Sequence, residues 1–151
     1  MQKMTVIITR VGAQLPVGFE DLRQASVAED FEFLNRLEKK WRDGRYDDDR
    51  LATVRIACSE GVTLGVGAQT YDEYDLAPDH RRMRHFYGSP RARRGGVGRR
   101  LAHALIEDAF ACGARLRLRA THAVSTAFWD AMGFARIEAD RSTHEMWRAR
   151  A

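Results

Sequence analysis

The chain has 151 residues, of which 44% are hydrophobic and 30% are charged, a composition that suits a single globular domain with one sizeable core. Its 25 basic and 21 acidic residues give a net charge of only +4. No stretch approaches the roughly 20 apolar residues that a membrane span needs, and the apolar run near the N-terminus is too short for a signal peptide, so we expect residues 1–151 to form one cytoplasmic domain without a membrane partner.

The first half of the sequence predicts a strand, a helical region and a hairpin. Apolar residues recur at steps of three and four within residues 18–44, which predicts helix with a break near Ser26. This stripe comprises Val27, Phe31, Leu34, Leu37 and Trp41. Glu60-Gly61 is a hairpin signal between two β-rich segments. Strands are therefore expected over residues 5–10, 51–58 and 62–70.

The second half predicts four strands and two helices. Leu101, Leu105 and Ala109 form one apolar stripe, which predicts a helix over residues 98–111 with Gly113 as its C-terminal cap. The other elements are a helix over residues 123–132 and strands over residues 83–87, 115–120, 134–138 and 144–148. This order predicts an α/β (α+β) fold, with a mixed sheet of about seven strands and helices on both faces.

The two cysteines, Cys58 and Cys112, lie far apart in the sequence. Neither belongs to a C-x-x-C motif or to a cysteine–histidine pattern with the spacing of metal ligands, which argues against a zinc site and against a disulfide scaffold. We interpret both as reduced core thiols and expect no metal.

Residues 81–100 contain eight arginines and four glycines but no acid, so the rest of the chain has 17 basic and 21 acidic residues. Glycines allow successive backbone N–H groups to turn toward one point. A helix that follows them adds unpaired N–H groups and the positive end of its dipole, and arginine offers bidentate partners to phosphate oxygens. The segment therefore predicts a polyphosphate site, and the alternative is a solvated arginine-rich turn.

Three motifs together resemble the GNAT superfamily of N-acetyltransferases. Arg93-x-x-Gly96-x-Gly98 is similar to the family's pyrophosphate signature, R/Q-x-x-G-x-G/A, at a helix start. Residues 86–90 stand where the family's fourth strand meets the pantetheine arm of the donor. Residues 127–134, Ala-Phe-Trp-Asp-Ala-Met-Gly-Phe, resemble the family's A-x-F-Y-x-x-x-G-F segment. The order of elements matches across nearly the whole chain.

The resemblance implies that acetyl-CoA binds in a wedge between splayed fourth and fifth strands. Backbone N–H groups of residues 94–99 would hold the pyrophosphate, and Phe86 and Gly88 would pair with the pantetheine like an added strand. His122 and Trp129 would lie near the thioester. The implied donor-binding residues are Phe86, Tyr87, Gly88, Arg93, Arg94, Gly95, Gly96, Val97, Gly98, Arg99, His122 and Trp129.

The sequence departs from the family where a catalytic acid is usual. Trp129 stands in the place of a tyrosine that protonates the leaving thiol, and an indole N–H is no useful acid near neutral pH. Histidine is suited to moving a proton near pH 7, so the candidate bases, ranked by expected distance from the thioester, are His122, His85 and His144. For each, the alternative is a hydrogen-bonded structural histidine.

Arg115, Arg117 and Arg119 alternate along one predicted strand and should share one face. Buried arginines are costly without partners. Either that face is open to solvent or to a second subunit, or acids such as Glu29 or Glu107 meet it. A homodimer is left open.

Three functions compete at this point. The first is N-acetyl transfer from acetyl-CoA to an amine of unidentified structure. The second is a CoA-binding or regulatory module with little or no catalysis, suggested by Trp129. The third, nucleic-acid binding, is disfavoured because only Phe86 and Tyr87 could stack on bases beside the arginines.

Overall fold

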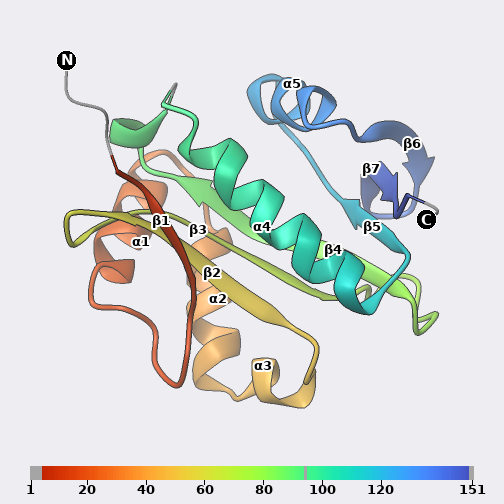
Figure 1. Cartoon of the computed structure of the whole chain (residues 1–151), viewed down its shortest axis with the longest axis horizontal. Coiled ribbons are helices and arrows are strands. Elements are labelled where there is room, and N and C mark those ends of the chain that lie inside the picture. The colour runs from red at the N-terminus through yellow and green to blue at the C-terminus, as the bar shows by residue number, and fades with distance from the viewer. Residues whose placement is uncertain (1–4, 94, 150–151) are drawn as a thin grey trace.

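Seven strands form one sheet in the order β1-β2-β3-β4-β5-β7-β6 (Figure 1). The structure is a computed structural model that describes residues 5–93 and 95–149. In chain order its elements are β1 (Ile7–Arg10), α1 (Phe19–Ala28), α2 (Phe33–Arg42), α3 (Arg45–Asp48), β2 (Thr53–Ser59), β3 (Val62–Tyr71), β4 (His80–Gly88), the 3₁₀ turn η1 (Pro90–Ala92), α4 (Val97–Cys112), β5 (Arg115–Leu118), α5 (Ala123–Ala131), β6 (Ala135–Ala139) and β7 (Ser142–Trp147). The predicted mixed sheet with helices on both faces is confirmed.

The helical region breaks later than the sequence predicts. Its two helices are separated at residues 29–32 rather than near Ser26. Asp30 adopts a φ of +67°, and the N–H of Phe31 donates to the carbonyl of Ser26 at 2.9 Å, which closes the end of α1. Phe31 thereby leaves the predicted apolar stripe and stands in the α1–α2 connection.

The helices cover the two faces of the sheet with separate apolar clusters. Leu101 and Leu105 of α4 are fully buried on one face. On the other face Leu34 and Leu37 of α2 are fully buried beside β2, β3 and β4. Figure 1 shows α4 lying along one side of the sheet, with α1 and α2 on the side behind it. β3 lies between these layers.

The end of α4 corrects one reading of the sequence. Gly113 is an extended residue, with a φ of −153°, and not a left-handed cap. A Cβ there would lie 2.6 Å from Cγ of Arg81 and 2.8 Å from the carbonyl oxygen of Asp79. Position 113 is therefore a glycine because residues at the start of β4 approach its backbone too closely for a side chain. Cys58 and Cys112 are free thiols, but both are only half-buried.

β4 and β5 are paired at one end and separate at the other. They run parallel, and their printed register covers three pairs, from His80↔Arg115 to Arg82↔Arg117. Beyond Arg82, β3 is the only strand of the described residues that pairs with β4, and that register contains a bulge. His85 lies in the bulge with a φ of +53°. The remaining strand pairs are antiparallel. Within the described residues, no helix has both the length and the apolar character that a bilayer span requires.

Candidate active site

At the start of α4, the glycine loop presents amide hydrogens that have no acceptor among the described residues. Gly96 caps the helix with a φ of +79°, and the N–H of Arg100 donates to its carbonyl at 3.1 Å. The preceding amides of Val97, Gly98 and Arg99 have no helical carbonyl four residues back, and the helix dipole adds positive potential there. Such an end binds phosphate oxygens.

Gly95 and Arg94 differ from the other expected N–H donors of this loop. The N–H of Gly95 donates to the carbonyl of Ala92 at 3.4 Å, so it contributes to the turn after η1. Arg94 lies outside the described residues. The amides of Val97, Gly98 and Arg99 therefore carry the argument for an anion site.

Arg93 braces the loop against α1 and β4. Its guanidinium forms a fork with the carboxylate of Glu29, at 2.7 and 2.8 Å, and its Nη2 donates to the carbonyl of Gly88 at 3.3 Å. The hydroxyl of Tyr87 also donates to Glu29. The hydrogen bond from Arg93 lowers the pKa of Glu29, while burial and the nearby carboxylate raise the pKa of Tyr87. Arg93 thus fixes the position of the loop.

Trp129 belongs to an aromatic cluster between β4 and α5. Its side chain is only 5% exposed, and its ring centroid lies 4.9 Å from that of Phe86, 4.8 Å from that of Phe128 and 5.3 Å from that of Phe134. Phe128 also lies against Gly98, where an added Cβ would meet its ring at 3.5 Å. These rings form an apolar wall beside the glycine loop and the open part of β4.

The three candidate histidines have different surroundings. His122 is exposed just before α5, and its ring centroid lies 5.2 Å from that of Phe31 in the α1–α2 connection. His144 is 1% exposed, and its ring nitrogens contact the Thr143 hydroxyl at 2.8 Å and Asp130 at 2.9 Å. This pairing makes His144 a link between β7 and α5 and leaves no ring nitrogen free for an acceptor.

His85 is poorly placed to exchange a proton. Burial, reinforced by Arg84, Lys40 and Arg36, lowers its pKa from 6.5 to about 3. Its Nε2 is buried without a hydrogen-bond partner among the described residues. Of the three candidates, only His122 presents its imidazole to solvent.

The paired end of β4 and β5 is held by buried ions. Asp72 is 1% exposed and contacts Arg115 at 3.0 Å and Arg82 at 3.7 Å. Arg115 also contacts Asp75 at 2.9 Å, a hydrogen bond that lowers the pKa of Asp75 to about 2. Arg117 pairs with Glu145 of β7 at 2.7 Å. Acids therefore meet Arg115 and Arg117, as one of the alternatives suggested, but they are Asp72, Asp75 and Glu145 and not Glu29 or Glu107.

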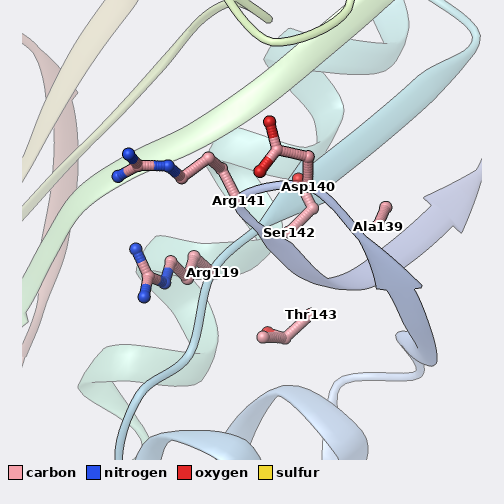
Figure 2. A pocket seen from close by; sticks show the side chains of 6 residues that line it. All are labelled: Arg119, Ala139, Asp140, Arg141, Ser142 and Thr143. Atoms are coloured by element: carbon pink, nitrogen blue, oxygen red, sulfur yellow. The ribbon is translucent and has the colours of Figure 1, made fainter.

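A cavity of about 560 Å³ lies beside the end of β5. It is lined by Arg119, Ala139, Asp140, Arg141, Ser142 and Thr143. Figure 2 shows the side chains of Arg119 and Arg141 extending to the left of the view, with the carboxylate of Asp140 above them. Among the described residues, no cluster of three or more histidine, cysteine, aspartate or glutamate side chains could hold a metal ion.

Together, a helix start with free amides and a strand that parts from its parallel neighbour define the fold of an acyl-CoA-dependent acyltransferase. The family model described as acetyltransferase (GNAT) family matches residues 19–134, and the chain belongs to this family. The predicted family resemblance is thereby confirmed. No curated protein matches the chain.

Solved structures agree with this assignment. A proposed acetyltransferase from Exiguobacterium sp. 255-15 is 25% identical, with a TM-score of 0.82, and the match covers 95% of this chain and 94% of that one. A ribosomal-protein-alanine N-acetyltransferase from Brucella melitensis is 17% identical, with a TM-score of 0.68 over 94% and 99%. PaiA N-acetyltransferase from Thermoplasma acidophilum, solved with coenzyme A, is 11% identical, with a TM-score of 0.66 over 96% and 100%. The last two share the fold alone.

Reasoning from the sequence missed the partners that position this site. Glu29 meets Arg93 across 64 residues, and Asp130 meets His144 across 14. Arg141 stands in the turn between β6 and β7. A turn between the last two strands was the only local signal for Arg141, and nothing in one sequence pairs Glu29 with Arg93.

Proposed function

We propose that the protein is an N-acetyltransferase that transfers the acetyl group of acetyl-CoA to an acceptor amine by direct attack on the thioester. One observation carries this proposal: the free edge of β4 beyond Arg82 leads to the unpaired amides at the start of α4. The amides of Val97, Gly98 and Arg99 would hold the diphosphate. The free β4 edge offers backbone groups to the pantetheine amides, as an added strand would find them.

The reaction must remove a proton from the acceptor. A lysine-like amine has a pKa of about 10.4, so its free base costs roughly 4.6 kcal/mol at pH 7. His122 would take this proton, directly or through one water molecule. As the N–C bond forms and the C–S bond breaks, backbone N–H groups near Tyr87 or Gly88 would stabilise the negative charge on the carbonyl oxygen.

The departing thiolate needs less help. Its pKa of about 8.5 puts protonation within roughly 2 kcal/mol of balance at pH 7. Solvent can supply this proton, so the tryptophan at position 129 does not prevent turnover. Because protonating the thiolate costs less than deprotonating the amine, a working transferase is favoured over an inactive fold even without the tyrosine acid.

The observation that favours the alternative is the burial of Trp129 among Phe86, Phe128 and Phe134, because it leaves an apolar surface where a proton donor is usual. On this alternative the protein binds CoA and turns over little or none of it. Titration calorimetry with CoA, followed by thiol release from acetyl-CoA with a panel of amines, separates the two. Binding with amine-dependent release supports the transferase, whereas binding without release for any amine supports the CoA module.

A failure to bind CoA would contradict both readings. Nucleic-acid binding would then be tested by the salt dependence of its affinity, which falls steeply when phosphates are neutralised by arginines. If the protein is an acetyltransferase, CoA should displace any nucleic acid that binds to it.

A further inference from the structure

We propose that the cavity bounded by Arg119 and Arg141 binds an anionic group, a carboxylate or a phosphate, carried by the acceptor amine. This inference rests on the proposed function and names the class of its substrate. The cavity has about 560 Å³, which is enough for a small polar group and part of the chain that carries it.

The first argument comes from three alternating arginines, two in β5 and the third just after its end. Arg115 has two carboxylate partners and Arg117 has one. Arg119, the next residue on the same face, is exposed and has no carboxylate within 4.0 Å among the described residues. The protein thus neutralises the two inner arginines and leaves the third, at the mouth of the cavity, available to a ligand.

Arg141 supplies the second argument, because its backbone is held in place. It has a φ of +59° in the turn between β6 and β7. Arg82 of β4 donates to the Arg141 carbonyl at 2.5 Å and to the Ser142 hydroxyl at 2.8 Å. Arg82 is itself 5% exposed. This buried guanidinium fixes the turn, so the side chain of Arg141 starts from a fixed point beside Arg119 (Figure 2).

The charges of the cavity suit an anion. Its lining contains two arginines and one acid, Asp140. No ion pair joins Asp140 to either guanidinium among the residues described. Two unpaired guanidinium forks on one side of a cavity match the oxygens of a carboxylate or phosphate.

The cavity also lies at the correct end of the cleft. Arg82↔Arg117 is the last pair of β4 and β5, and Arg119 follows two residues later. The free edge of β4 begins at the same point. A ligand with its anionic end between Arg119 and Arg141 can therefore extend its amine along that edge toward the expected thioester.

The experiment compares matched amines with wild type, Arg119→Gln, Arg141→Gln and the double variant. Ethanolamine and O-phosphoethanolamine test phosphate, and hexylamine and 6-aminohexanoate test carboxylate. We expect the anionic member of at least one pair to be favoured in kcat/KM, and each single substitution to reduce that preference about 10- to 100-fold, the usual effect of losing a charge-assisted hydrogen bond. Arg119→Lys should restore part of the preference.

Arg50→Gln is the matched control, because Arg50 is exposed between α3 and β2, away from the cavity. It should leave every amine unaffected. Equal kcat/KM for charged and neutral partners in wild type, or substitutions that slow both equally, would overturn the anionic subsite while leaving the transferase intact.

A binding measurement separates this inference from the proposed function. O-phosphoethanolamine and 6-aminohexanoate are titrated into the protein saturated with CoA, where no acetyl transfer occurs. Binding of either ligand that weakens about tenfold or more in the double variant supports the subsite even if no amine is acetylated. Equal affinity in wild type and double variant, or binding of neither ligand to wild type, would overturn it.

Discussion

The two ends of the β4–β5 pair are lined by side chains of opposite character, charged at one end and apolar at the other. At the paired end, Asp72, Arg82 and Arg115 form a buried ionic network. At the open end, Phe86 and Trp129 form part of an apolar wall, and the β4 edge has no strand partner on this side. The paired end uses its charged groups in contacts within the protein, whereas the edge of β4 at the open end is where we propose that the donor binds. Buried ion pairs thus lie where β4 and β5 are paired, and the pairing ends at Arg82, the last residue of β4 in that network.

The largest effect should come from breaking the paired end. Asp72→Asn leaves the buried guanidinium of Arg115 without its closest inner charge partner. Removal of one member of a buried ion pair typically costs about 3–5 kcal/mol, so we expect a loss of this size in the free energy of unfolding, measured with urea. Asp75→Asn removes the outer, more exposed partner of Arg115 and should cost clearly less. Equal losses would show that the network does not depend on the buried carboxylate.

A substitution at the open end should weaken donor binding far more than it weakens folding. Gly96→Asp places a carboxylate at the start of α4, where the diphosphate is expected, and should weaken CoA binding about 100-fold, or ~2.7 kcal/mol. Gly61→Asp is a close control. Both glycines have a φ of +79°, and a Cβ at either would meet nothing within 4 Å, so the two substitutions carry similar backbone strain. Calorimetry with CoA that finds unaltered affinity for Gly96→Asp would remove the loop from the donor site.

Local sequence patterns predict the bounds of α4 better than those of β4. The strict stripe of α4 predicted residues 98–111, and the helix spans Val97–Cys112. In contrast, β4 begins at His80, three residues before the predicted strand, because Arg81 and Arg82 are charged yet buried. Their partners, Asp49 and Asp72, are distant in the sequence. Burial of a charge depends on contacts that no local period encodes.

The candidate site also combines features that a local motif encodes with features that depend on distant contacts. Its glycine loop is a contiguous motif, so it can be proposed as a donor site from the sequence alone. His85 was expected beside the cleft, but the bulge in β4 changes the period of two that placed it. Arg119 and Arg141 line one cavity although they come from separate elements, and the β6–β7 turn that carries Arg141 is bonded to Arg82. A cavity between separate elements appears only in three dimensions.

The bulge at the open end allows a sharper test through pH. The pKa of His85 falls from 6.5 to about 3 on folding, so between these values the unfolded chain binds more protons than the folded one. Stability should therefore fall as pH decreases from 6.5, by up to about 1.4 kcal/mol per pH unit. His85→Asn has no proton to bind and tolerates a positive φ. Urea unfolding at pH 7, 6 and 5 should show a steeper loss in wild type than in this variant, and parallel losses would contradict the burial of a neutral imidazole.

The smallest effect concerns the proton path at the open end. His122→Ala should lower kcat/KM at pH 7 about tenfold, less than the 10²–10⁴ typical of an enclosed base, because solvent reaches this exposed imidazole and water can replace it in part. The rate should also rise more steeply toward alkaline pH, since the amine must then lose its proton to solvent. His103→Ala is the matched control, because His103 is exposed on α4. An unchanged pH–rate profile for His122→Ala, with CoA affinity retained, would mean that the acceptor reaches the free edge of β4 already deprotonated.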